Sequence, residues 1–271
     1  MWYAQVSSYN IAMHLVDTHC HLDDTAFDAD RDEVLRHCRE LGVDRIVIPA
    51  VTRSGWDALL NLCAHHPELA PALGLHPVYI EQHQQADLDR LAQYLENPAV
   101  VAVGEIGLDF LIDNPDKEKQ EQFFDAQLDL AKQADLPVIL HVRKAHDQVL
   151  GYLRKKQLKG GIAHAFNGSL EQARHYINLG FKLGFGGMLT YERSSKLRRL
   201  ARELPLDSIV LETDSPDLTV SQHRGERNSP EYLPFCLQAL SEVREMDPAE
   251  AAKRTTGNAL SVLNLHLPGT N

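Results

Sequence analysis

Short apolar runs recur at regular intervals along the chain. Each is four to eight residues long and rich in Val, Ile, Leu and Ala. Continuous apolar runs of this length are typical of strands that are buried on both faces, as in parallel sheets. The predicted strands are 14–17, 45–51, 69–75, 99–103, 137–142, 161–165, 181–185 and 208–211.

Segments with helical periodicity alternate with these runs. Within 30–41, Val34, Leu35 and Cys38 recur at helical spacing, and Gly42 follows as a stop signal. The other predicted helices are 118–134, 170–179, 196–204 and 234–243. This alternation indicates a parallel sheet, and eight strand–helix units in a chain of this size favour a (β/α)8 TIM barrel over an open doubly wound sheet.

Nothing in the pattern divides the chain into parts. It contains no GxGxxG or Walker-type loop, no Pro/Gly/Ser-rich linker and no low-complexity stretch, so we expect a single barrel domain over 13–271. Residues 1–12 do not fit the alternation. They are either an N-terminal tail or a mis-assigned start, since Met13 directly precedes the first predicted strand.

Composition narrows the class of protein. With 44% hydrophobic and 24% charged residues, the chain is neither disordered nor collagen-like. No run reaches the roughly 20 apolar residues of a membrane helix. The four cysteines form no CxxC pair, and no secretory leader is visible. We therefore expect reduced, buried thiols, a cytoplasmic location and no membrane partner.

The charge balance bears on possible substrates. The net charge is −11, from 27 Lys and Arg against 38 Asp and Glu. Such a chain repels polyanions at long range. Any nucleic-acid substrate therefore requires local cationic groups or bound metal ions for its attraction.

Side chains of the types that bind metals, activate water or bind anions lie at the ends of many predicted strands. They are Asp17, His19 and His21 after the first, His76 after the third, Glu105 after the fourth, His141 and Arg143 at the fifth, His164 at the sixth and Asp214 after the eighth. Barrel enzymes place their chemistry at the carboxyl ends of the strands, where these residues would converge. Buried imidazoles and carboxylates are costly unless paired or metal-bound, and a nitrogen–oxygen set without thiolate favours Zn, Mn, Fe or Mg.

Each histidine also has an ordinary interpretation. A single strand histidine such as His164 is more often a hydrogen-bonded core residue, and a His-x-His pair arises by accident. The joint occurrence at five strand ends is what predicts a metal site. Six histidines within or beside helical segments are interpreted as solvated or capping groups: His37, His65, His66, His83, His146 and His175.

Several longer motifs occur in a fixed order. They are DTHCH at 17–21, GLHP at 74–77, GEIGLD at 104–109, PVILH at 137–141, AHAF at 163–166, ETDSP at 212–216 and RNSP at 227–230. In this order they resemble the TatD family of metal-dependent hydrolases and deoxyribonucleases, over about residues 15 to 263. The resemblance implies an amidohydrolase-like barrel with two divalent metal ions, of a type such as Mg, Mn or Zn.

The resemblance also implies a role for several residues of these motifs in this chain. By analogy, His19 and His21 hold one metal with help from Asp214, and His141 and His164 hold the second. Glu105 bridges both metals, and Asp17 orients an imidazole from behind. Two departures from the family pattern bear on substrate choice: AFN at 165–167 within the sixth motif, and Phe110-Leu111 where paired tyrosines are usual.

The expected reaction is hydrolysis of a phosphodiester by a metal-activated water. Asp214 would accept the proton of that water, and Glu105 would hold the metal pair. Arg143 or the Arg227-Asn228 loop is expected to bind phosphate. Arg227 can equally be a solvated loop cation, and His76 either contacts substrate or caps the end of its strand.

Three functions are open at this point. The first is a deoxyribonuclease that trims single-stranded DNA, most plausibly from the 3′ end. The second is a small-molecule ester, lactone or amide hydrolase that uses the same metal site, because a fold does not fix a function. The third, an inactive binding protein, is disfavoured because every matched ligand position holds a competent residue. No stable protein partner is implied.

Overall fold

Eight parallel strands form one sheet and follow one another in chain order. The computed structural model describes residues 13–267, so the expectation of a tail or mis-assigned start over 1–12 lies outside the described residues. The strands are β1 (Leu15–Asp17), β2 (Val43–Pro49), β3 (Leu69–Leu73), β4 (Ala102–Asp109), β5 (Val138–Arg143), β6 (Gly161–Ala163), β7 (Phe181–Phe185) and β8 (Ile209–Leu211).

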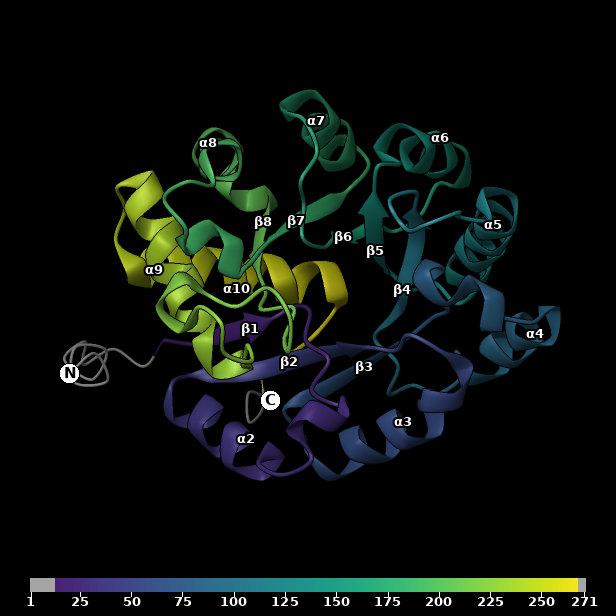
Figure 1. Ribbon diagram of the computed structural model, residues 1–271, viewed down its shortest axis with the longest axis horizontal. Helices are drawn as coiled ribbons and strands as arrows, with labels where there is room; N and C mark the ends of the chain where they lie inside the picture. The colour runs from purple at the N-terminus through teal and green to yellow at the C-terminus, as the bar shows by residue number, and fades with distance from the viewer. Residues whose placement is uncertain (1–12, 268–271) are drawn as a thin grey trace.

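The sheet curls until its two edges meet. The main-chain N–H of Thr18 and its hydroxyl both donate to the carbonyl of Leu211, at 3.1 and 3.0 Å, which joins the end of β1 to the end of β8. Figure 1 shows the strands in the middle of a ring of helices. The predicted single (β/α)8 barrel is therefore confirmed.

A helix follows each strand, and a second one follows the last. The helices are α2 (Arg31–Glu40), α3 (Trp56–His65), α4 (Gln85–Tyr94), α5 (Lys117–Gln133), α6 (His146–Lys156), α7 (Leu170–Asn178), α8 (Ser195–Glu203), α9 (Leu233–Arg244) and α10 (Pro248–Leu263). The five helices expected from periodicity match α2, α5, α7, α8 and α9. Their apolar stripes face the strands, as Val34, Leu35 and Cys38 of α2 illustrate.

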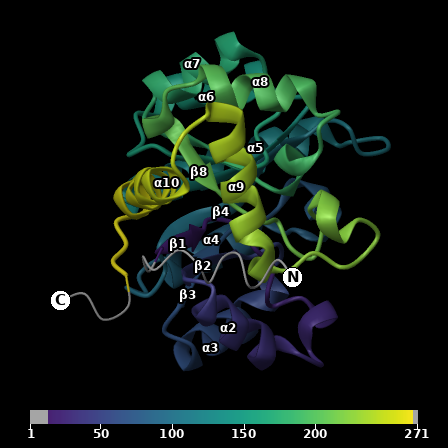
Figure 2. The ribbon, with the colours of Figure 1, turned by 90° about the vertical axis from the view of Figure 1, so that its left-hand side faces the viewer.

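The interior of the barrel is a separate apolar layer. It contains Val16, Val47, Ile139 and Val210 from four strands, together with Leu263 of α10. Figure 2 shows α10 on one side of the strands and the long segment between β8 and α9 on the other. One end of the barrel is thus closed by a helix, and the other end is free to carry polar side chains.

β4 differs most from its expected bounds of 99–103. It runs over Ala102–Asp109, so the GEIGLD motif is itself strand rather than the loop after it. Glycines and acids break the apolar run, which hides the strand from a pattern search. Gly107 has φ +150, and a Cβ there would lie 1.9 Å from the carbonyl oxygen of His141, so glycine is required for the close pairing of β4 with β5.

Two smaller expectations are also settled by burial. Cys20, Cys38 and Cys236 are buried, Cys63 is half-buried, and none of the four forms a disulfide. His83 was expected to be solvated or capping, but it is only 1% exposed, and its Nε2 lies 2.9 Å from the carbonyl oxygen of His76. Packing of the turn after β3 against α5 explains this burial, since His83 also contacts Phe123.

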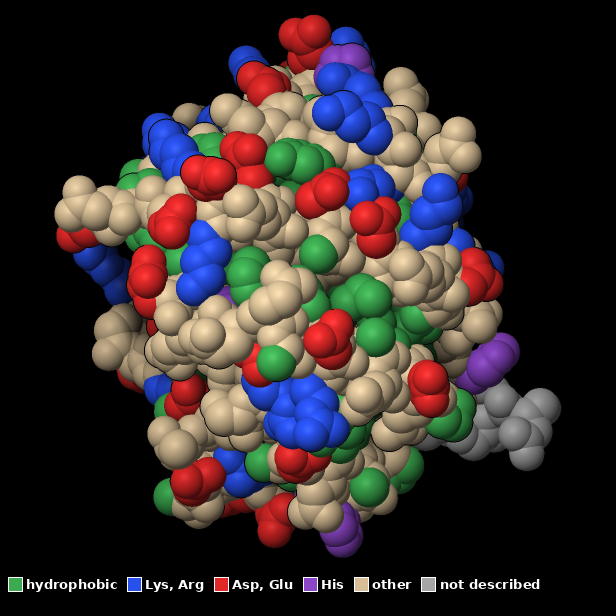
Figure 3. Space-filling model, turned by 90° about the vertical axis from the view of Figure 1, so that its right-hand side faces the viewer, with side chains coloured by type: hydrophobic (Ala, Val, Ile, Leu, Met, Phe, Trp, Pro, Cys, Tyr) green, Lys and Arg blue, Asp and Glu red, His purple; other side chains and the backbone are tan. Residues whose placement is uncertain are grey.

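The surface of the described part carries both charge signs. Figure 3 shows Lys and Arg interspersed with Asp and Glu over the face where α4 and α5 lie, without a large area of one sign. None of the helices within 13–267 combines the length and apolar character that a bilayer crossing requires. This face therefore offers no broad area of one charge sign that would attract or repel a polyanion at long range.

Candidate metal centre

The polar end of the barrel gathers side chains from five strands. His19 and His21 follow β1, Glu105 lies in β4 and His141 in β5, and the set is completed by His164 after β6 and Asp214 after β8. His19 is fully buried, and Glu105 is 1% exposed. The closed order of the strands explains this convergence, because the carboxyl ends of all eight strands share one mouth.

Glu105 lies at the centre, and its two oxygens face different imidazoles. Oε2 lies 3.1 Å from Nε2 of His19 and 3.6 Å from Nε2 of His21. Oε1 lies 2.8 Å from Nδ1 of His141 and 2.9 Å from Nε2 of His164. Burial opposes the charge of Glu105, but the surrounding imidazoles hold its pKa well below the usual range, so the side chain is a carboxylate.

Asp214, which follows β8, lies next to the two histidines that follow β1. Its Oδ1 lies 3.6 Å from Nε2 of His19 and 3.9 Å from Nε2 of His21. Its main-chain N–H donates to the carbonyl of His19 at 2.8 Å, which ties the loop after β8 to the loop after β1. Asp214 has φ +58, a left-handed conformation that aspartate tolerates better than most residues and that often marks functional sites.

The donor set fits divalent metal ions. Three groups have ligand atoms that all lie within 4.8 Å of one another: His19, Glu105 and His164; His19, His21 and Asp214; and His76, Glu105 and His141. The Nε2 atoms of His19 and His21 lie only 3.3 Å apart. Burial holds the pKa of His19 well below its ordinary value, so its ring is neutral and has a lone pair for a metal.

The pKa of His164 favours a protonated ring in the absence of metal. Burial disfavours its charge, but Glu105 outweighs that effect and raises the pKa of His164 to about 10. Its Nδ1 is buried and has no hydrogen-bond partner among the described residues, as does Nδ1 of His19. A metal ion held by this ring would have to displace that proton, so its affinity would depend on pH.

Asp109 contacts the site but received no role in the sequence analysis. Its Oδ2 lies 3.0 Å from Nε2 of His141, and the side chain is fully buried. A proton on that Nε2 leaves a lone pair on Nδ1, which is the atom that faces Glu105. The signal was present, since Glu105 and Asp109 are four residues apart on one strand and therefore share a face.

His76 combines the two roles that the sequence left open. Its Nδ1 accepts the N–H of Val78 at 3.1 Å, which caps the turn after β3. Burial lowers the pKa of His76 to about 4, so the ring is neutral and its proton must sit on Nε2. That atom lies 3.2 Å from Oε1 of Glu105, so His76 both caps and donates into the site.

Asp17 acts differently from the expected contact with an imidazole. Its carboxylate accepts the N–H of His19 at 3.2 Å, the N–H of Thr213 at 3.0 Å and the hydroxyl of Thr213 at 2.5 Å. None of these bonds involves a ring. Asp17 therefore positions the loops after β1 and β8 through their main chains, because its fixed donors come from the backbone and a hydroxyl.

Glu212 is a second buried carboxyl group that received no role from the sequence. Its Oε1 accepts the N–H of Ala165 at 2.5 Å, and it lies 3.8 Å from Nδ1 of His164. Burial raises the pKa of Glu212 to about 8. A Cβ on Gly184 would lie 2.0 Å from Oε2 of Glu212, so glycine at this position makes room for the carboxyl group behind His164.

Of the three residues expected to bind phosphate, only Arg143 lines the cavity at the mouth of the barrel. Arg143 lines the mouth and lies 3.8 Å from Asp109. Arg227 instead forms a bidentate ion pair with Asp30 and stacks on Phe27, and it does not line the cavity. Chain folding places Asp30 at the start of α2 next to the 227–230 segment, and this neighbour is not visible in the local sequence.

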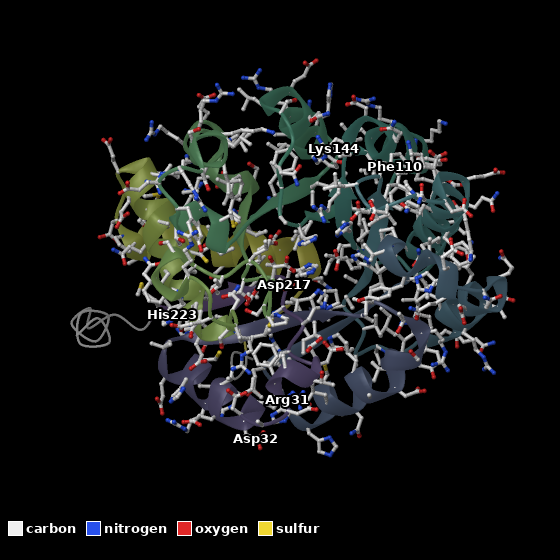
Figure 4. The ribbon with its side chains drawn as sticks, viewed as in Figure 1. Arg31, Asp32, Phe110, Lys144, Asp217 and His223 are labelled. Atoms are coloured by element: carbon white, nitrogen blue, oxygen red, sulfur yellow. The ribbon has the colours of Figure 1, made fainter. Side chains whose placement is uncertain are left out.

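Asn228 also has a structural contact, with the loop that follows β8. It is fully buried, and its amide donates to the carbonyls of Thr213 and Asp217 at 2.8 and 2.6 Å. It therefore supports the segment that carries Asp214, and it does not face the cavity. Asp217 itself lies near the middle of the view in Figure 4.

A cavity of about 910 Å³ lies above the metal-ligand cluster. Its rim holds four of the exposed large apolar side chains in the described part of the chain, namely Val78, Tyr79, Met188 and Leu218. Arg143, Arg193 and Lys196 add positive charge to the same rim. Asp23, Asp24 and Asp217 line the cavity as well, so its rim carries both charge signs. The site therefore offers a floor of imidazoles and carboxylates, with apolar surfaces and local cations suited to a ligand that has both ring and anionic parts.

Comparison with known proteins identifies the family. A family model described as TatD related DNase matches residues 16–264. The chain belongs to the TatD family of metal-dependent hydrolases.

Individual relatives of this TatD-family chain can be aligned with it over nearly its whole length. The metal-dependent hydrolase YjjV of Escherichia coli K12 is 42% identical over 253 residues, which cover 92% of this chain and 98% of YjjV. The 3′-5′ ssDNA/RNA exonuclease TatD of Erwinia tasmaniensis is 33% identical over 259 residues, covering 93% of this chain and all (100%) of that protein. The crystal structure of the YjjV TatD homologue from Escherichia coli superposes with a TM-score of 0.91 at 40% identity, covering 94% of this chain and 100% of that one.

Proposed function

We propose that this protein is a divalent-metal-dependent phosphodiesterase that removes nucleotides from the 3′ ends of single-stranded DNA. The observation that carries the proposal is the arrangement around Glu105, whose two oxygens face two separate pairs of imidazoles. A carboxylate placed in this way suits a pair of divalent ions, and paired metals are common in enzymes that cleave phosphodiesters.

Each metal would have its own ligands. His19, His21 and Asp214 would hold one ion, His141 and His164 would hold the other, and Glu105 would bridge them. Bound divalent ions of a type such as Mg, Mn or Zn would supply a water of lowered pKa and charge stabilisation for the reacting phosphate. Asp109 and Asp17 would keep the ligands in position, one through the His141 ring and the other through the main chain.

The remaining side chains would handle the proton and the substrate. Oδ1 of Asp214 faces His19 and His21, so its other oxygen, Oδ2, would accept the proton of the attacking water. Arg143 would bind the scissile phosphate, with its guanidinium half exposed at the mouth. His76 would donate from Nε2 to a phosphate oxygen when substrate displaces it from Glu105.

The choice of single-stranded DNA is supported by the rim and by one relative. Exposed Tyr79, Met188 and Leu218 offer surfaces against which bases could stack or pack, beside the cations of the rim. The Erwinia relative is named an ssDNA/RNA exonuclease. Because the chain carries a net charge of −11, the grip would be local and short, which favours trimming of ends over processive digestion.

The test is hydrolysis of a 5′-labelled single-stranded oligonucleotide with Mg²⁺ or Mn²⁺. We expect stepwise shortening of the labelled strand, with unlabelled mononucleotides released from its 3′ end. This shortening should be lost on chelation, restored by added metal and abolished in His141→Ala, with elemental analysis showing less bound metal. His175→Ala on the outer helix α7 serves as the matched control and should behave like the wild type. Activity that survives both chelation and His141→Ala would overturn the metal mechanism.

A small-molecule hydrolase is the second candidate. The cavity of about 910 Å³ falls within the range of roughly 300–1,000 Å³ that is common for small-ligand pockets. A panel of esters, lactones and amides, assayed in parallel, separates the two functions. Turnover of that panel without release of nucleotides would favour the second candidate.

A further inference from the structure

A second, smaller cavity of about 460 Å³ adjoins the mouth. Arg143, Asn167 and Lys196 line both cavities, so the two share a wall. The smaller cavity lies between the end of β5 and the starts of α6, α7 and α8, and Figure 4 shows Lys144 on that side of the molecule. None of the proposed metal ligands lines it.

Positive charge is concentrated in this second cavity. Arg143, Lys144 and Lys196 all line it, and no Asp or Glu is among its described lining residues. Three cations side by side repel one another, and they do so here in a chain with a net charge of −11. A bound anion would remove that repulsion.

Few acidic groups within the described residues neutralise these three cations. Arg143 lies 3.8 Å from buried Asp109, which His141 already engages at 3.0 Å. Lys196 donates to the carbonyl of Asn167, a neutral acceptor. Lys144 forms no ion pair or hydrogen bond through its ammonium among the described residues, and Asp147, the nearest acid on α6, accepts from Gln172 at 2.8 Å.

The backbone presents Lys144 in an unusual way. Lys144 has φ +56, a left-handed conformation that is uncommon for a residue with a long side chain. It directly follows Arg143, the last residue of β5, so the turn brings two cations to one edge of the mouth. Backbone strain of this kind tends to persist where it positions a side chain for function.

The other wall of the cavity is neutral and ordered. Nε2 of His146 lies 3.3 Å from Oδ1 of Asn167, and Nδ1 of His146 lies 3.2 Å from the hydroxyl of Tyr176. Burial lowers the pKa of His146, so the neutral ring is favoured and the positive charge of the cavity comes from Arg143, Lys144 and Lys196. Leu111 supplies an apolar edge and is 48% exposed.

We infer that this cavity is a second phosphate site that binds an internal phosphodiester of the strand whose end lies in the metal centre. Lys144 and Lys196 contact the phosphate oxygens, Arg143 lies between this phosphate and the scissile one, and Leu111 packs against the intervening nucleoside. This inference rests on the proposed function and sharpens it, because the preferred substrate then has at least two phosphodiester linkages.

The first experiment measures binding without catalysis. A fluorescent single-stranded oligonucleotide is titrated in EDTA with the wild type, Lys144→Gln, Lys196→Gln and the double variant. Lys253→Gln, on α10 at the closed end of the barrel, is the matched control. We expect Kd to rise about threefold to fivefold for each lysine removed, with no change for the control.

Salt dependence shows whether the lysines contact phosphate. The slope of log Kd against log salt should fall by about 0.7 for each lysine lost, because fewer counterions are released from a single strand. A merely structural role would leave this slope unchanged. An unchanged Kd and slope in the double variant would overturn the inference, even if the enzyme proved to be a nuclease.

The second experiment compares chain lengths under catalysis. A trinucleotide with two internal linkages and no terminal phosphate should have a KM several-fold lower than a dinucleotide with one linkage. Lys144→Gln, at a residue that lines only the smaller cavity, should remove that advantage while leaving dinucleotide turnover unchanged. A length advantage that persists in the variant, or one seen only when a terminal phosphate is added, would overturn the assignment to an internal linkage.

The two proposals fail in distinguishable ways. If no phosphodiester is hydrolysed by the wild type, the proposed function fails, while binding in EDTA still decides the phosphate site. If hydrolysis occurs without dependence on Lys144 or Lys196, the proposed function stands and the second phosphate site is wrong.

Discussion

The two ends of the barrel are built from the same strands but are filled in opposite ways. At the closed end, Val16, Val47 and Val210 meet Leu263 of α10 in an apolar cluster. At the open end, five of the eight strands lead into imidazoles and carboxylates that lie 2.8 to 3.9 Å apart. Apolar packing stabilises the first end, whereas the second holds desolvated imidazoles and carboxylates whose mutual attraction only partly offsets the cost of burying them.

This contrast predicts that the closed end determines the stability of the fold and the open end determines catalytic turnover. A substitution at the closed end should lower the free energy of unfolding and leave turnover alone. A substitution at the open end should do the reverse, because proteins commonly give up stability at sites that must bind ions or substrate. The following predictions are ordered by the size of the expected effect.

Glu105→Gln should produce the largest change. Loss of the carboxylate charge between the two imidazole pairs should lower kcat by about 1,000-fold or more, since the metal pair loses its bridge. Thermal unfolding of the metal-free protein should change little. The measurement is oligonucleotide hydrolysis together with metal content, and Glu118→Gln on α5 is the control. Near-normal turnover would show that the comparison of the two ends is wrong.

Leu263→Ala should have the largest effect at the closed end. The side chain is 2% exposed and packs in the barrel interior, so its truncation should lower the free energy of unfolding by about 2–4 kcal/mol. Urea titration measures this loss. At a temperature where the variant is folded, its kcat should equal that of the wild type, and a large drop in kcat would mean that the two ends are coupled.

Asp109→Asn should reduce metal affinity or activity by about 10- to 100-fold. The amide keeps the volume of the side chain, but it holds the proton on Nε2 of His141 less strongly and so weakens Nδ1 as a ligand. Metal titration followed by spectroscopy with Co²⁺ separates this effect from a folding defect. Asp113→Asn, in the exposed loop after β4, should have no effect on affinity.

Arg227→Met should have the smallest effect. Hydrogen bonds from Arg227 lower the pKa of Asp30, so the folded-state value lies below the unfolded one. The pair therefore stabilises the fold above the unfolded pKa of about 4, and this contribution is lost as pH falls through the folded value. Because both groups are partly exposed, the loss at pH 7 should be about 0.5–1 kcal/mol.

The pH dependence and an activity assay check this prediction together. The difference in unfolding free energy between wild type and Arg227→Met should shrink below pH 4 and in high salt. Hydrolysis of single-stranded DNA should remain unchanged at pH 7. A marked rise in KM would instead return Arg227 to the substrate-binding role that its position in the RNSP motif had suggested.

Much of the fold could be predicted from the local pattern, because the buried strands and the covering helices of a parallel barrel each require a recognisable spacing of apolar residues. Strands such as 181–185 are buried on both faces and appear as apolar runs, and α2 shows its stripe through Val34, Leu35 and Cys38. β4 was the exception. Its inner face holds Glu105 and Asp109 beside glycines, so function overrides the apolar pattern there.

The proposed metal ligands could also be named from the sequence, because each one lies in a strand or within four residues of its end. What the sequence could not supply was the set of partners that define how each ligand works. Asp109 supports His141, Asp17 holds the main chain of His19, and Arg227 is occupied by Asp30. These pairs are 32, 2 and 197 residues apart, and even the closest of them depends on how a loop turns.

The sequence by itself determined the alternation of elements, the family and the kinds of ligand atom, since these depend on residue type and order. Only the tertiary structure decided which cations remain free for a substrate. Lys144 and Lys196 come from different strand–helix units, and the curvature of the sheet brings them to one cavity. Charge interactions depend on distance in space, and local sequence does not encode that distance.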